Sequence, residues 1–145
     1  MRYLAYFLTV LVPLVMISCG AEKEQVTEEE VVEERVRPAA SGGTSAAYFS
    51  YSNTFDKPDT LISVNSAVAR LTQIHESYET EDGMTGMRER REVIIPAGEN
   101  VVFKQGGLHV MMMDLRKDLS AGDSVGVELE LKLAGRVSRL LPVQP

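Results

Sequence analysis

The chain has 145 residues, enough for one folded domain with a modest core. Its formal charge of −6 argues against a nucleic-acid partner, because neutralising phosphates requires a basic face. The only dense basic cluster, at Arg88, Arg90 and Arg91, is interleaved with glutamates, so we expect it to be a solvated strand face.

Residues 1–18 have the pattern of a lipoprotein signal peptide. One early arginine precedes an apolar run over residues 4–17, which is too short for a transmembrane helix of about 20 apolar residues. The run ends in MISCG at residues 16–20, which resembles a bacterial lipobox. Cys19 is the only cysteine, so no intramolecular disulfide is possible. We expect Cys19 to be lipidated and to tether the protein to a membrane outside the cytoplasm, in the periplasm or at the cell surface; the alternative is an ordinary cleaved signal peptide.

Residues 19–46 are rich first in glutamate and then in alanine, glycine and serine. Such a segment cannot bury a core, so we expect a lipid-anchored, acidic, flexible linker. A short helix starting at Thr27 is the alternative, and it would also act as a spacer.

Residues 47–145 consist of short runs rich in β-branched and aromatic side chains, separated by turn signals. The sequence predicts strands over residues 47–54, 60–66, 69–78, 91–97, 100–105, 108–115, 124–133 and 136–143. The clearest alternation points Val125, Val127, Leu129, Leu131 and Leu133 inward, with a turn at Ala134-Gly135 into the last strand. This number of short strands predicts an all-β fold, a Greek-key β-sandwich or barrel.

After the predicted signal peptide, every histidine and methionine falls within residues 75–87 or 109–113. Side chains alternate along a strand, so His109, Met111 and Met113 should share one face and Met112 the other. His109 and Met111 would then be about 6.6 Å apart at Cα and could reach one ion. We expect Met112 to be core and Met113 to lie deeper in the barrel. Met84 and Met87 lie beside glycines in a polar hairpin that we expect to be able to move.

The types of these side chains indicate a metal. Thioether sulfur suits Cu(I), whereas zinc prefers thiolate, imidazole and carboxylate, and calcium or magnesium prefer oxygen. A blue-copper centre would need a cysteine ligand, and Cys19 lies in the tether. We therefore expect a Cu(I) site that does not cycle its redox state.

The arrangement of these residues resembles that of the periplasmic copper chaperone family PCuAC. The family has a histidine, a methionine after a hairpin, twenty-one further residues and then His-x-Met, and here Met87 is followed at that spacing by His109 and Met111. The interval from His75 to Met87 is one residue longer than in the family. The resemblance implies a cupredoxin-like fold and Cu(I) held by His75, Met87, His109 and Met111, with Met84 and Met113 as alternative candidates.

The resemblance also implies delivery of copper to the binuclear copper site of cytochrome c oxidase, with the apo copper-site subunit or another copper chaperone as partner. The sequence carries no nucleophile motif and no placed acidic pair, so we do not expect an enzyme. Two other functions stay open. One is a lipoprotein that sequesters copper for storage or resistance, and the other is a metal-free β-sandwich whose methionines form a protein interface.

Overall fold

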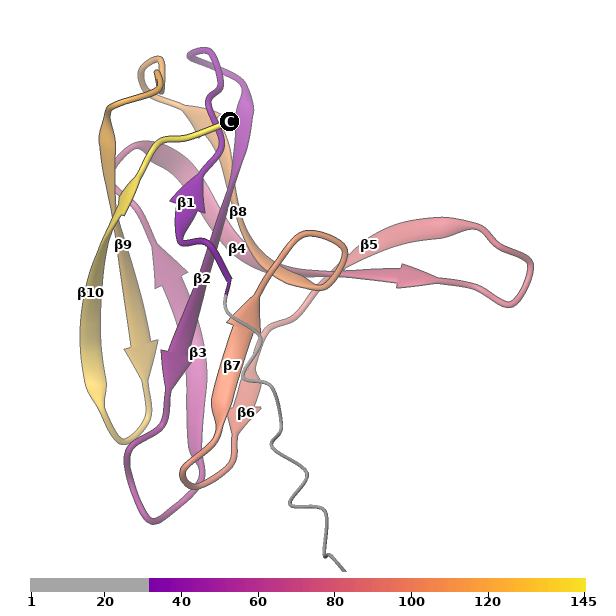
Figure 1. Ribbon diagram of the computed structural model, residues 1–145, viewed down its shortest axis with the longest axis vertical. Coiled ribbons are helices and arrows are strands. Elements are labelled where there is room, and N and C mark those ends of the chain that lie inside the picture. The colour runs from indigo at the N-terminus through magenta and orange to yellow at the C-terminus, as the bar shows by residue number, and fades with distance from the viewer. Residues whose placement is uncertain (1–31) are drawn as a thin grey trace, which may run out of the picture.

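The computed structural model describes residues 32–145 (Figure 1). The predicted signal peptide, Cys19 and the first part of the predicted linker lie outside these residues. No helix within the described range is long and apolar enough to cross a membrane.

The described residues form ten β-strands and no α-helix. In chain order the strands are β1 (Arg35–Val36), β2 (Thr44–Ser52), β3 (Asp59–Asn65), β4 (Ala69–Glu79), β5 (Thr85–Glu89), β6 (Val93–Ile95), β7 (Asn100–Phe103), β8 (Leu108–Leu115), β9 (Ser124–Leu131) and β10 (Gly135–Pro142). The eight predicted strands overlap β2, β3, β4 and β6–β10, and the sequence reading missed β1 and β5.

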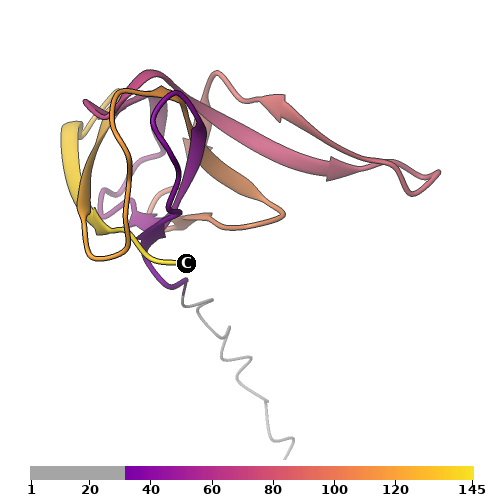
Figure 2. The same cartoon turned by 90° about the horizontal axis from the view of Figure 1, so that it is seen from above.

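The strands form two sheets in which every pair is antiparallel. The first sheet has the order β1-β2-β8-β4-β5, with β7 also paired to β2, and the second has the order β10-β9-β3-β6. Seen from above, the strands surround a common interior, with one hairpin extending away (Figure 2). The predicted all-β sandwich or barrel is confirmed.

Strand β9 shows how alternation builds the core. Val125, Val127, Leu129 and Leu131 are all buried, as predicted. Leu133, which we expected to continue this row, is 52% exposed. The reason is that β9 ends at Leu131 and the chain turns immediately, so Leu133 belongs to the turn. Gly135 has a φ of 71°, which permits the chain to enter β10 there.

The folded domain begins earlier than the predicted boundary at residue 47. Val36 in β1 is fully buried and forms a β-bridge with Val143, which follows the last strand in the sequence. Residues 44–46 already belong to β2. The linker prediction was therefore wrong for its last part, because one buried valine and a strand pairing anchor a segment whose composition is otherwise that of a solvated spacer.

The β4–β5 hairpin projects from the body of the domain (Figures 1 and 2). It carries Met87 within strand β5, where Met87 is paired with Ser77. The expectation that Met87 lies in a glycine-rich loop was wrong, because the residue belongs to a paired strand. Gly86 also lies in the strand, and a Cβ at this position would stand 2.6 Å from the ring of Tyr78, so the glycine provides room for an aromatic side chain.

Asp59 fastens the β9–β10 turn to the start of β3. Its buried carboxylate accepts hydrogen bonds from the backbone N–H groups of Thr60 at 2.6 Å, Leu133 at 2.8 Å and Ala134 at 2.9 Å. Burial raises the pKa of Asp59, but these donors together lower it by more, so the pKa lies below its ordinary value of 3.8.

We predict that Asp59→Ala lowers the free energy of unfolding by about 3 kcal/mol, because buried N–H donors lose their acceptor. Since the folded-state pKa is lowered, the contribution of Asp59 is complete above about pH 3.8 and is lost as the pH falls through the folded-state pKa. Urea unfolding on either side of that pH measures both effects. The matched control is Asp56→Ala at an exposed position, which should change stability by less than about 0.5 kcal/mol. Equal losses in the two variants would contradict this role of Asp59.

Candidate metal centre

The order of strands in the first sheet brings the two histidines together. Strand β8 lies between β2 and β4, and its register places His109 directly opposite His75. Directly opposed residues of an antiparallel pair point to the same face of the sheet. The two imidazole rings stand edge to face, with centroids 6.1 Å apart and an interplanar angle of 69°.

Two methionines lie on the same face as the histidines. Met111 follows His109 by two residues on β8, and Met87 is paired with Ser77, two residues beyond His75 on β4. Met87, His109 and Met111 line one cavity of about 270 Å³. His75 is not among the lining residues and lies beside the cavity, next to His109. The structure thus brings the four predicted ligands to one region.

The other methionines of the described chain lie outside this cavity. Met84 is in the turn of the β4–β5 hairpin and is 64% exposed, so the geometry favours Met87 as the hairpin sulfur. Met112 is fully buried on the opposite face, as predicted. Met113 is half-buried rather than part of the core, because its pairing with Thr44 and Leu71 places it on the outer face with Met111.

His109 is held by the backbone of the turn that precedes it. Its Nδ1 lies 2.9 Å from the carbonyl oxygen of Gly107. A carbonyl can only accept, so Nδ1 carries the hydrogen and Nε2 keeps its lone pair. The histidine is buried, with 5% of its surface exposed. A fixed ring with a free nitrogen is the usual state of a metal-binding histidine.

His75 is half-buried and is favoured in its neutral form. Burial is the main cause that lowers its pKa below 6.5, and repulsion from His109 adds to it, while Glu89 opposes the shift. Its Nε2 lies 3.1 Å from Oε1 of Gln73. Its Nδ1 is buried and has no hydrogen-bond partner within the described structure. A neutral imidazole with an unpartnered buried nitrogen is a suitable metal ligand.

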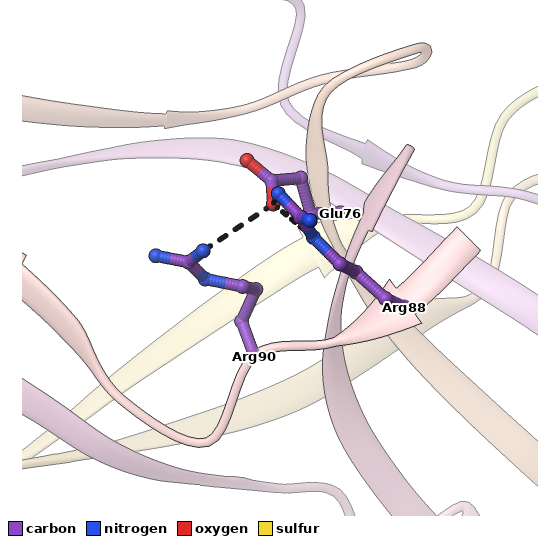
Figure 3. Close-up of polar contacts among 3 residues, drawn as sticks. All are labelled: Glu76, Arg88 and Arg90. Carbon is purple, nitrogen blue, oxygen red and sulfur yellow. Dashed lines mark hydrogen bonds and ion pairs between the residues drawn. The ribbon is translucent and has the colours of Figure 1, made fainter. Parts of the chain in front are cut away.

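Side chains on the hairpin face opposite the histidines and methionines hold β5 against β4. Glu76 on β4 accepts a hydrogen bond from Arg88 Nε at 2.8 Å and pairs with Arg90 at 3.4 Å (Figure 3). The hydrogen bond from Arg88 is the main cause of a lowered pKa at Glu76. The Arg88 guanidinium also lies over the ring of Tyr78, 5.5 Å from its centroid. Because Met87 directly precedes Arg88, these contacts position the sulfur-bearing strand.

Sequence reasoning missed the residues that complete the cavity wall. Arg37 and Tyr48 come from the segment that includes β1 and β2, and Gln105 and Gly106 come from the β7–β8 turn. That turn reaches the base of the hairpin, where Gly107 accepts a hydrogen bond from the Ser77 N–H at 3.1 Å. Arg37 lay within the predicted linker, and Tyr48 comes near the site only through the pairing of β2 with β8. Gln105 and Gly106 precede His109 closely in the sequence, but their residue types do not mark them as part of a cavity wall.

The donor set at this site consists of two imidazoles and two thioethers. Nowhere in residues 32–145 do three or more His, Cys, Asp and Glu side chains gather so that they could hold a metal ion. Neutral sulfur and nitrogen donors suit a soft monovalent ion such as Cu(I), and they suit Ca²⁺ or Mg²⁺ poorly because those ions bind oxygen.

Comparison with known proteins identifies the family. The family model described as "Putative lipoprotein LpqE-like" matches residues 30–143. A curated relative, "Putative lipoprotein Lxx21020" of Leifsonia xyli subsp. xyli, is 31% identical over 73% of this chain. The chain covers 64% of that relative, which is less than two thirds of its length.

Two solved structures share the fold. The copper-bound PCuAC domain from PmoF2 matches with a TM-score of 0.62 and 26% identity over 77% of this chain and 88% of that domain. The Cu(I) form of DR1885 from Deinococcus radiodurans matches with a TM-score of 0.57 and 26% identity over 86% of this chain and 85% of that protein. The predicted cupredoxin-like fold is confirmed, and the chain belongs to the LpqE-like lipoprotein family, with the fold of a PCuAC domain.

Proposed function

We propose that this protein is a lipid-anchored, extracytoplasmic chaperone that binds one Cu(I) ion and passes it to another protein. The observation that carries the proposal is the His75–His109 pair, with a free nitrogen on each ring and Met87 and Met111 on the same face. The copper-bound and Cu(I)-loaded neighbours of the same fold support it. The function is not enzymatic, since binding and release of the ion require no covalent step.

In this proposal His75, His109, Met111 and Met87 hold the ion, and lipidated Cys19 tethers the domain. Met87 is 59% exposed, so an incoming ligand from an acceptor could reach its sulfur first. The buried His109 and half-buried Met111 would keep the ion until transfer. The acceptor we propose is the apo binuclear copper-site domain of a cytochrome c oxidase subunit. Exposure of one ligand favours transfer over sequestration.

Replacing Met87 and Met111 together by alanine should lower Cu(I) affinity by more than about 100-fold and leave the domain folded. We expect at least this loss because removing a residue that only orients a metal ligand already lowers metal affinity by about 10- to 100-fold. Anaerobic titration against a Cu(I) chelator gives affinity and stoichiometry, which we expect to be one ion per chain.

The matched control for that experiment is the Met84→Ala and Met113→Ala double variant, which removes two thioethers outside the cavity. It should retain wild-type affinity. A folded Met87 and Met111 variant with unchanged affinity would disprove the ligand assignment, and absence of Cu(I) uptake by the wild type would favour the metal-free interaction protein.

Copper transfer separates the chaperone from the storage protein. Mixing the Cu(I)-loaded protein with a labelled apo copper-site domain of an oxidase subunit should produce handover at a rate that rises with acceptor concentration, because the acceptor attacks the bound ion directly. Stopped-flow or NMR observation of the acceptor follows the transfer. A rate independent of acceptor concentration would mean that the ion must first dissociate, as expected of a storage protein.

The lowered pKa of His75 predicts that this ring takes up a proton only at a lower pH than an ordinary histidine. In the apo protein, the His75 ring should titrate below pH 6.5, measured by NMR of its carbon-bound ring protons. The unfolded chain takes up this proton near the ordinary pKa, so stability falls as the pH drops from there through the folded-state value. A His75→Gln variant should lose less stability over that interval. Titration of His75 above pH 6.5 would contradict the environment described.

A further inference from the structure

Gln73 contacts one of the two histidines and lies on the same face of β4. It precedes His75 by two residues and is paired with Met111 across to β8. Its amide oxygen Oε1 lies 3.1 Å from Nε2 of His75. Gln73 is therefore next to two of the proposed ligands without contributing a donor typical of copper sites.

The chemistry of this contact decides which nitrogen of His75 is free. A neutral imidazole carries one N–H and one lone pair, and an amide oxygen only accepts hydrogen bonds. With Oε1 facing Nε2, the hydrogen is on Nε2 and the lone pair is on Nδ1. That Nδ1 is buried and has no other partner in the described part of the chain.

The other histidine is held in the opposite way. At His109, Nδ1–H donates a hydrogen bond to the Gly107 carbonyl, and the lone pair is left on Nε2. The two rings, with centroids 6.1 Å apart, would thus offer different nitrogens to one ion. One tautomer depends on the backbone, which no substitution removes, and the other depends on a single side chain.

We propose that Gln73 is a positioning residue that fixes His75 as the Nε2–H tautomer and so makes Nδ1 its Cu(I)-binding nitrogen. This inference rests on the proposed function for the identity of the ion, but the tautomer itself is a property of the apo protein. A rotated Gln73 amide would donate to Nε2 instead and would put the hydrogen on Nδ1, where it would block binding.

The test is long-range ¹H–¹⁵N NMR of the imidazoles in the ¹⁵N-labelled apo protein, at a pH where both rings are neutral. Assignment uses His75→Gln. We expect the Nε2–H pattern for His75 in the wild type, a mixture of tautomers in Gln73→Leu and restoration of the pattern in Gln73→Glu, whose carboxylate also only accepts. Gln105→Leu, at an exposed glutamine that lines the cavity, is the matched control and should leave His75 unchanged.

The Nδ1–H pattern in the wild type, or an unchanged tautomer in a folded Gln73→Leu variant, would overturn the proposal. Anaerobic Cu(I) titration then links the tautomer to the site: Gln73→Leu should bind Cu(I) about 10- to 100-fold more weakly, and Gln73→Glu should recover most of the loss. Wild-type Cu(I) affinity in Gln73→Leu with a shifted tautomer would refute Nδ1 as the ligand atom while leaving the chaperone proposal intact. Failure of the wild type to bind Cu(I) would refute the chaperone, and the apo spectra would still decide the tautomer.

Discussion

The pairing of β8 with β4 is the constraint on which the site depends. This register sets His109 opposite His75 and Met111 opposite Gln73. Side chains alternate between faces, so a slip of one residue would carry every side chain of β8 to the other face. The core excludes such a slip, because Val110 and Met112 are fully buried on the inner face and would be replaced there by His109 and its outward-facing methionine neighbours. Packing of the interior therefore fixes the geometry of the exterior, where the proposed ligands lie.

The β4–β5 hairpin contributes Met87 to the site, and β5 belongs to the same sheet as β8 and β4. Within residues 32–145, strand β5 pairs only with β4, and it projects from the body, so its position relies on contacts within the hairpin (Figure 1). The Glu76 ion pairs with Arg88 and Arg90 and the contact between Tyr78 and Gly86 provide them on the far face. Exposed ion pairs contribute little to stability in general, and here their effect is to hold Met87 beside His109 and Met111. The result is a site with a buried part on β8 and an exposed part on β5.

Much of this arrangement could be predicted from the sequence, and the missing parts share one cause. Alternation identified β9 and most other strands, and the rarity of histidine and methionine marked the candidate ligands. The burial of Val36 could not be foreseen, because it depends on pairing with Val143, which is far away in the sequence. Leu133 is exposed because it lies in the turn after β9, where its N–H donates to the distant Asp59 carboxylate instead of continuing the strand. The contact of Gln73 with His75 is local in sequence, yet it has meaning only once β8 is placed beside β4. Local patterns therefore predicted elements and ligand types, while pairing over long distances decided burial, tautomer and cavity walls.

We propose, above all, that imidazole nitrogen and thioether sulfur from the three strands β4, β5 and β8 hold one Cu(I) ion. X-ray absorption at the copper edge of the anaerobically loaded protein tests it most directly, because the first coordination shell distinguishes sulfur from nitrogen and oxygen. We expect a Cu(I) edge with both nitrogen and sulfur in that shell, and loss of the sulfur contribution when Met87 and Met111 are replaced. A shell of nitrogen and oxygen alone, or a sulfur contribution that persists without these two methionines, would contradict the account.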